Sequence, residues 1–239
     1  MIRSPLRISC SCAAVLFLSA CGGTGGTGSA APAPPAAAST AQLEALYHAR
    51  QAEALDRVSE ADVEFLTGMI FHHAQALVMS AWAPTNGASA SIRTLASRII
   101  NAQKDEIHNM QVWLRDRSRP VPEVDDSGAT RMPGAEGHAM HGMDHGMDHG
   151  MIMPGMLSPE QMRELEGASG PDFDRLFLTY MIQHHQGAVG MVHELFAKDG
   201  AAQDELIFKL ASDIQVDQIT EINRMQLMLD ALPGAERFD

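Results

Sequence analysis

Apolar residues recur at helical spacing in every regular segment of the chain. A first segment, over 40–58, keeps a loose helical period through Leu43, Leu46, Tyr47 and Leu55. The pattern then predicts four long helices and a short one, over 59–83, 89–117, 173–198, 201–232 and 158–166. Proline and glycine clusters separate these segments, and no strand pattern or series of turns suggests a sheet. We therefore expect an all-α fold.

Capping signals mark the starts of several of these helices. Ser59 stands three residues before Asp62, a spacing that resembles a capping box. The run Ser158-Pro159-Glu160-Gln161 joins an N-cap, a proline in the first turn and a glutamine at the third position. Asp172 is the expected cap of the helix over 173–198.

The helical pattern occurs twice. Residues 62–79 and 174–191 are identical at ten of eighteen positions, including both adjacent histidines and two methionines. The helices that follow also match, because residues 95–114 and 210–229 share ten of twenty positions. The repeated unit is thus a helical hairpin. Two such hairpins most simply form a four-helix bundle.

One face of each repeat mixes apolar side chains with potential ligands. At 100° per residue, a face about 120° wide collects the first set of residues. These are Asp62, Phe65, Met69, His72, His73, Ala76 and Met79, repeated as Asp174, Phe177, Met181, His184, His185, Ala188 and Met191. The second helices add Gln103, Glu106 and Met110, repeated as Gln218, Glu221 and Met225.

Buried histidines need partners, and this face offers two kinds. One is a metal ion, and the other is the carboxylate of Glu106 or Glu221. Thioethers favour Cu(I), imidazole accepts copper in either common state, and the lack of cysteine pairs disfavours structural zinc. The alternative is that the methionines fill the core and the histidines only hydrogen-bond. His108 and His193 fall off this face, and His48 has no clear role.

A biased tract separates the two repeats. Residues 118–157 are expected to be a linker, and within 138–151 the unit His-Gly-Met-Asp recurs. Its potential ligands are His138, Met140, His141, Met143, His145, Met147, His149 and Met151, flanked by Met132, Met153 and Met156. Glycine in each unit opposes a stable helix, so we expect this tract to chelate metal and to be disordered without it. A low-complexity spacer is the alternative.

The N-terminus has the features of a bacterial lipoprotein signal. Arg3 and Arg7 precede a short apolar run, and Leu18-Ser19-Ala20-Cys21 resembles a processing box that makes Cys21 the lipidated N-terminus. An ordinary secretory signal is the alternative. Residues 22–38, rich in Gly, Ala, Pro, Ser and Thr, then form a flexible tether. Removal of residues 1–20 leaves only Cys21, so no disulfide can form within the mature chain.

These observations divide the chain into a signal peptide, a tether, two hairpin repeats and the linker between them. The expected boundaries are 1–20, 21–39, 40–117, 118–157 and 158–232, where the first repeat includes a leading helix. The formal net charge of −13 argues against a nucleic-acid groove, which needs a basic field.

The two repeats resemble the domain of unknown function 305 family. The resemblance rests on Phe65, Met69, Ile70, His72, His73, Ala76 and Met79, their copies over 177–191, and the trailing Gln, Glu, Ile and Met at 103, 106, 107 and 110 and at 218, 221, 222 and 225. The family is ferritin-like and includes CopM-type extracytoplasmic copper-binding proteins, so the resemblance implies copper binding and copper resistance. The dense tract between the halves departs from the family pattern.

The sequence favours a lipid-anchored protein that sequesters copper at the periplasmic or cell-surface face of a membrane. We expect Cu(I), with Cu(II) or Ag(I) as alternatives. The candidate ligands on the helices are Met69, His72, His73, Met79, Glu106, Met110, Met181, His184, His185, Met191, Glu221 and Met225. A di-metal oxidoreductase is disfavoured, because its usual Glu-x-x-His motif is absent from the sequence. A chaperone that passes copper to a protein acceptor uses the same ligands and stays open.

Overall fold

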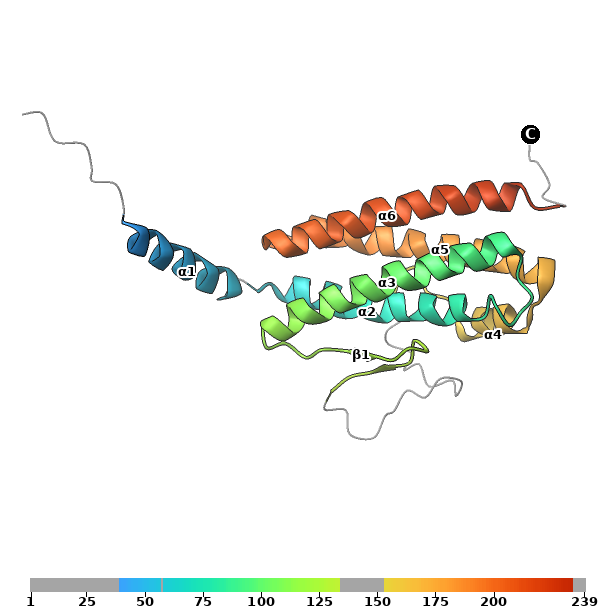
Figure 1. The fold of residues 1–239 in the computed structure, drawn as a ribbon, viewed down its shortest axis with the longest axis horizontal. Coiled ribbons are helices and arrows are strands. Elements are labelled where there is room, and N and C mark those ends of the chain that lie inside the picture. Colours follow the sequence, from blue (N-terminus) through green and yellow to red (C-terminus); the bar gives the residue numbers. More distant parts are fainter. Residues whose placement is uncertain (1–38, 57, 134–152, 234–239) are drawn as a thin grey trace, which may run out of the picture. The chain divides into compact units, whose positions relative to one another are not determined.

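The computed structural model describes residues 39–56, 58–133 and 153–233. These ranges contain six helices and one two-stranded antiparallel sheet (Figure 1). The elements are α1 (Thr40–Asp56), α2 (Glu60–Ala81), α3 (Ala90–Asp116), β1 (Glu123–Val124), β2 (Thr130–Arg131), α4 (Pro159–Gly167), α5 (Gly170–Ala197) and α6 (Glu205–Asp230). The expected all-α class is confirmed, and the short strand pair was not expected.

The chain divides into two compact units, Met1–Leu43 and Glu44–Asp239, and the division falls inside α1. Helix α1 exposes Leu43, Leu46 and Tyr47. No helix in the described ranges combines the length and the apolar character needed to cross a membrane.

Capping side chains explain most helix starts. The Ser59 hydroxyl accepts a hydrogen bond from the backbone N–H of Ala61 at the start of α2. Helix α4 begins with the expected capping box, in which Ser158 and Gln161 each accept from the other's backbone N–H. Each such cap satisfies a backbone donor that the helix leaves unpaired and contributes about 1 kcal/mol.

Two helix starts differ from the expected ones. Helix α6 begins at Glu205 rather than at residue 201, because the Asp204 carboxylate caps it by accepting from the N–H groups of Leu206 and Ile207. Helix α5 begins earlier, at Gly170, because the fixed φ of Pro171 suits the first turn. Asp172 is therefore not the cap but lies within that turn, where its negative charge still favours the helix N-terminus.

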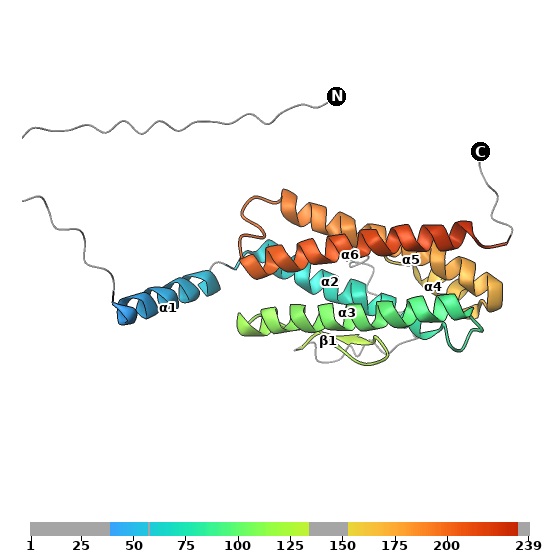
Figure 2. The ribbon, with the colours of Figure 1, turned by 45° about the horizontal axis from the view of Figure 1, so that its top comes forward.

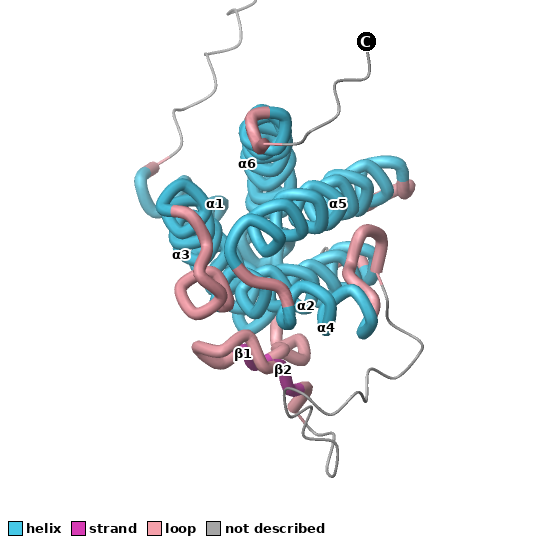
Figure 3. The backbone as a smooth tube through the Cα atoms, turned by 90° about the vertical axis from the view of Figure 1, so that its right-hand side faces the viewer, coloured by secondary structure: helices cyan, strands magenta, loops and turns pink. Residues whose placement is uncertain are grey.

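The helices pack as two hairpins. Helix α2 packs against α3, and α5 packs against α6 (Figure 2). The hairpins meet through α2 and α5, which lie together in the view along the helices (Figure 3). The repeated apolar positions, such as Phe65 and Met69 on α2 and Phe177 and Met181 on α5, are buried there. Each fully buried side chain of this kind contributes about 1.5–3 kcal/mol.

Two buried aspartates fasten the hairpins to each other. Asp62, at the start of α2, accepts a hydrogen bond of 2.7 Å from the backbone N–H of Ala202 in the α5–α6 connection. Asp174, near the start of α5, accepts from the backbone N–H of Ser89 at the end of the α2–α3 connection, at 3.0 and 3.3 Å. An aspartate of each repeat thus binds the connection between the two helices of the other repeat. A hydrogen bond to a charged acceptor contributes about 1.5–3 kcal/mol to stability.

The linker expected over 118–157 is partly built into the fold. After α3, residues 118–133 include β1 and β2, and Val121 and Val124 pack against the core. The amide of Gln111 on α3 donates to the Pro122 carbonyl at 2.8 Å. Gly128, with φ of +85°, lies so close to α2 that an added Cβ would be 2.7 Å from the Ala74 carbonyl oxygen.

A second linker segment, residues 153–157, crosses α2 and α5, and we call it the strap. The side-chain amide of Gln75 on α2 forms two hydrogen bonds with the Leu157 backbone, at 2.7 and 3.1 Å. The Gln183 amide on α5 donates to the Gly155 carbonyl at 3.3 Å. Residues 118–133 and 153–157 of the expected linker thus pack on the helices, where backbone groups of Pro122, Gly155 and Leu157 pair with helix side chains. The expected disorder of the tract concerns residues outside the described ranges.

Candidate metal-binding face

The two histidine pairs lie at the centre of the molecule, where α2 meets α5. His72, His73, His184 and His185 all have an exposed fraction of 0%. The rings of His72 and His184 touch across the two helices, with centroids 3.8 Å apart. Helical periodicity places each pair inward, and the repeat brings the two pairs together.

Hydrogen bonds fix the tautomer of the two touching histidines. Nε2 of His72 lies 3.0 Å from the Pro154 carbonyl oxygen in the strap, and Nε2 of His184 lies 3.0 Å from the His72 carbonyl oxygen. Carbonyl oxygens only accept, so each Nε2 carries the hydrogen and donates it. Burial lowers the pKa of His72 to about 3, and burial, with the neighbouring histidines, lowers the pKa of His184 well below its usual range. Both rings are neutral near pH 7, which leaves Nδ1 with a lone pair.

The outer member of each pair contacts a carboxylate. His73 Nε2 donates to Glu106 on α3 at 2.6 Å, and His185 Nε2 donates to Glu221 on α6 at 2.7 Å. The Glu106 and Glu221 side chains keep 14% and 21% of their surface exposed. Burial, and then these two carboxylates, raise the pKa of Asp217, which places a third acidic group near them. Glu106 and Glu221 thus each accept a hydrogen bond from a buried histidine.

Every one of the four histidines has a buried Nδ1 with no hydrogen-bond partner among the described residues. Leaving a buried acceptor unpaired costs about 1–3 kcal/mol per group. Metal-binding histidines share this arrangement, in which one ring nitrogen donates to a carbonyl or carboxylate and the other is left for the metal. The donor set therefore fits a metal ion bound through Nδ1.

The methionines predicted as helix ligands lie in the core. Met69, Met79, Met110, Met181 and Met225 have exposed fractions of 0%, and Met191 has 8%. Among the described residues, no three side chains from His, Cys, Asp and Glu gather in a group that can hold a metal ion. The buried methionine sulfurs are further potential ligands for a soft metal ion within the helices.

The strap is the part of this region that periodicity did not reveal. It contacts His72 through Pro154, and Gly187 on α5 makes room for it, since an added Cβ would lie 1.9 Å from the Pro154 carbonyl oxygen. A signal existed in the sequence. Gln75 and Gly187 occupy matching positions of the repeat but differ, and both contact the strap.

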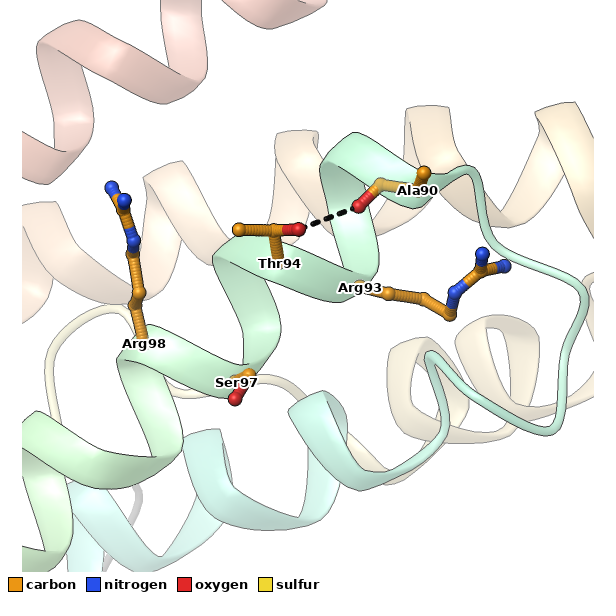
Figure 4. A pocket seen from close by; sticks show the side chains of 5 residues that line it. All are labelled: Ala90, Arg93, Thr94, Ser97 and Arg98. Atoms are coloured by element: carbon orange, nitrogen blue, oxygen red, sulfur yellow. Dashed lines mark hydrogen bonds between the residues drawn. The ribbon is translucent and has the colours of Figure 1, made fainter.

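Other candidates lie elsewhere. His48, His108 and His193 are exposed, as the helical pattern predicts for the last two. The eight ligands predicted in the tract, at 138–151, fall outside the described residues. A surface hollow of about 430 Å³ on α3 is lined by Ala90, Arg93, Thr94, Ser97 and Arg98 (Figure 4). The side chains of Arg93 and Arg98 point away from each other there, so the hollow does not focus positive charge on one ligand.

Fold and site together define a helical protein of two repeated hairpins with paired histidines buried at their junction. The sequence profile of the family described as Domain of unknown function (DUF305) matches residues 62–229, so the chain belongs to this family. An uncharacterized protein of Acanthamoeba polyphaga mimivirus is 39% identical over 56 residues, which are 23% of this chain. That match spans 37% of the viral protein's length.

Solved structures of the family have the same fold. A DUF305 fragment from Deinococcus radiodurans is 27% identical, with a TM-score of 0.56 over 73% of this chain and 98% of that one. A DUF305 protein from Streptomyces coelicolor, provisionally described as secreted, is 27% identical, with a TM-score of 0.55 over 71% and 91%. CopM in its Cu(II)-bound form is 32% identical, with a TM-score of 0.52 over 71% and 95%. CopM has also been solved in a Cu(I)-bound form, at 26% identity.

Proposed function

We propose that this protein binds copper ions outside the cytoplasm and sequesters them for copper tolerance or homeostasis. Cu(I) is the favoured cargo, and Cu(II) and Ag(I) are alternatives. The ligands come from the buried histidines and methionines of the helices and from the His/Met tract. One observation carries the proposal. In each of the four buried histidines, Nε2 is hydrogen-bonded, whereas Nδ1 has no hydrogen-bond partner among the described residues.

The chemistry of the donors supports copper over harder cations. Imidazole and thioether ligands select copper, whereas carboxylate and water suit Mg²⁺ and Ca²⁺. Glu106 and Glu221 then orient His73 and His185 rather than bind the ion themselves. The likeness to CopM, whose structures contain copper, supports the same choice of metal.

The location follows from the N-terminal features. Lipidation of Cys21 would hold the protein on a membrane, with residues 22–38 as the tether. An oxidising compartment suits a mature chain that uses methionine in place of cysteine. Such a protein has metal ions and the membrane as partners, and no nucleic acid.

Competition with a chromogenic Cu(I) chelator tests the proposal. We expect the soluble form, residues 22–239, to take up more than one Cu(I) per chain. To measure binding by the helices alone, the histidines of 138–151 are replaced by Gln and the methionines by Leu. Two buried histidines are then changed in this background. His72→Gln with His184→Gln should weaken the remaining binding by at least about 10- to 100-fold, the loss that is typical when only a hydrogen-bond partner of a metal ligand is removed.

The matched control changes two exposed histidines, His108→Gln with His193→Gln, in the same background. This pair should leave Cu(I) binding unchanged, and circular dichroism verifies that every variant is folded. Absence of Cu(I) uptake by the unchanged protein would refute copper sequestration.

Two alternatives differ from sequestration in what else would be observed. A di-metal oxidoreductase would hold iron or manganese and turn over with oxygen, and the described helices contain no Glu-x-x-His pair for it. A copper chaperone would transfer its metal to an acceptor protein, which metal exchange between the two purified proteins would reveal.

A further inference from the structure

Two differences between the repeats lie where the strap crosses the helices. Gln75 in the first repeat corresponds to Gly187 in the second, and both contact the strap backbone. Gly68 corresponds to Tyr180, whose hydroxyl donates to Glu164 on α4. The hydrogen bonds of the strap account for the first difference, between Gln75 and Gly187. They do not account for the second, the glycine at position 68.

Gly68 forms the floor of a small space that two methionines enter. A Cβ added at residue 68 would lie 3.0 Å from Sδ of Met153, in the strap, and 3.4 Å from Cε of Met191, on α5. The ends of these two side chains, which come from different segments, therefore both lie next to the bare backbone of α2 at residue 68. A tyrosine, as at the matching position of the other repeat, would fill this space.

This methionine pair is also the more accessible one. Met191 keeps 8% of its surface exposed and Met153 is half-buried, whereas Met69, Met79 and Met181 are fully enclosed. Met79 is the repeat equivalent of Met191, so the same position is fully enclosed in one repeat and slightly exposed in the other. Met153 and Met191 therefore lie closer to solvent than the enclosed methionines of the helices.

A nitrogen donor lies one turn along α2. His72 stands four residues after Gly68, so the two positions neighbour each other on one helix face. The His72 ring is held by the Pro154 carbonyl, directly next to Met153 in the chain, and its Nδ1 has no partner among the described residues. Two thioethers and an imidazole are a ligand set for a soft monovalent cation.

We propose that Met153 and Met191 form a thioether site for a soft monovalent cation, Cu(I) or Ag(I), over Gly68, with His72 as the neighbouring nitrogen ligand. The site rests on the proposed copper-binding function and adds to it an entry point for the metal on the solvent side of the buried histidines. Met153 belongs to the strap, so metal bound here also ties the strap to α5.

Methyl-labelled methionine gives a residue-by-residue test with Ag(I), which does not change oxidation state in the titration. The full soluble chain, residues 22–239, is labelled with ¹³C in the methionine methyl groups. Single Met→Leu variants assign the signals. We expect the Met153 and Met191 methyl signals to shift together as Ag(I) is added. The signals of Met162 and Met228, which pack against the core cluster that contains Phe173 and Phe177, should stay in place.

Gly68→Ala tests the geometry while both sulfurs stay in the protein. The new Cβ occupies the space over residue 68 and displaces the end of Met153, so about tenfold more Ag(I) or above should be needed for the Met153 and Met191 shifts. Alanine suits a helix better than glycine, so this variant should be at least as stable to heat. Gly190→Ala on α5 is the matched control, because nothing lies within 4 Å of its added Cβ.

The outcomes separate this inference from the proposed function. Shifts at tract methionines without shifts at Met153 and Met191 would overturn the thioether site and leave copper sequestration standing. Joint shifts that persist unchanged in Gly68→Ala would also overturn the site. A chain that binds neither Ag(I) nor Cu(I) contradicts both proposals.

Discussion

At the scale of single residues, each of the four buried histidines has one hydrogen-bonded ring nitrogen and one unpaired ring nitrogen, which suits the proposed metal binding. His72 and His184 donate through Nε2 to carbonyl oxygens, and burial keeps both rings neutral. A metal that binds at Nδ1 therefore displaces no proton from these two rings near pH 7, in contrast to a site built from protonated histidines.

The same neutrality predicts an acid-sensitive fold. The pKa values of His72 and His184 are lowered in the folded protein. Below about pH 6.5, these two histidines therefore bind protons in the unfolded chain but not in the folded one. The free energy of unfolding should fall between about pH 6.5 and pH 3, by up to about 1.4 kcal/mol per pH unit for each histidine. Urea unfolding of the metal-free protein at about pH 7 and pH 5 measures this loss.

Substitution isolates the two histidines. His72→Gln with His184→Gln should remove most of the pH dependence above pH 5, whereas the exposed pair His108→Gln with His193→Gln should retain it. An unchanged slope in the buried pair would mean that other groups cause the dependence.

Much of this residue-scale arrangement could be predicted from the sequence. A helical wheel places His72 and His73 on one inward face, the repeat supplies a second copy, and the same reasoning names Glu106 and Glu221 as partners. The tautomers could not be predicted, because they depend on a carbonyl of Pro154, and side-chain periodicity carries no information about backbone acceptors in a connecting segment.

At the scale of elements, the strap makes two similar hairpins inequivalent. It lies in a stretch that composition marks as a linker, yet its backbone pairs with Gln75 and Gln183. The strap could not be predicted as a packed segment, because it has neither helical nor strand periodicity. The informative signal was a glycine inside a helix, Gly187, at a position where the other repeat has a long polar side chain.

Gly187→Ala should therefore destabilise the protein, although alanine favours helices. Its Cβ would lie 1.9 Å from the Pro154 carbonyl oxygen and 2.6 Å from the Gly155 Cα, both backbone atoms that cannot turn aside. We expect a net loss of about 1–3 kcal/mol in the free energy of unfolding, typical of an overpacked core, measured by urea denaturation.

Gly190→Ala, one turn further along α5, tests the reason for that loss. Its added Cβ meets nothing within 4 Å, so it should stabilise the helix by about 0.5–1 kcal/mol. Equal effects of the two alanines would contradict the packing of the strap against Gly187.

At the scale of the whole molecule, the two hairpins act as one body on a proposed lipid tether. Asp62 and Asp174 each hold the connection of the opposite hairpin, so the halves are joined at both ends. The fold class could be predicted because the repeat spans both halves. The reciprocal aspartate contacts could not, because they join a side chain to a distant backbone N–H.

Cys21→Ala tests the tether. If Cys21 carries the lipid, the native protein should be recovered with membranes after cell fractionation and should incorporate labelled palmitate. The variant should lose the label and move to the soluble extracytoplasmic fraction. Recovery of both forms in the same soluble fraction would favour an ordinary secretory signal.

The contacts on either side of the His/Met tract set how strongly its ligands compete with those of the helices. Gly128 approaches the carbonyl of Ala74, and Leu157 pairs with the next residue, Gln75, so the chain returns to the turn of α2 that it left. If the tract binds copper as proposed, its ligands face the helices at an effective concentration of about millimolar, because the described segments on either side of it contact the same turn of α2. Dilution of the protein cannot lower this concentration. The division of copper between tract and helices is then governed by their relative affinities, whether the cell makes few copies of the protein or many.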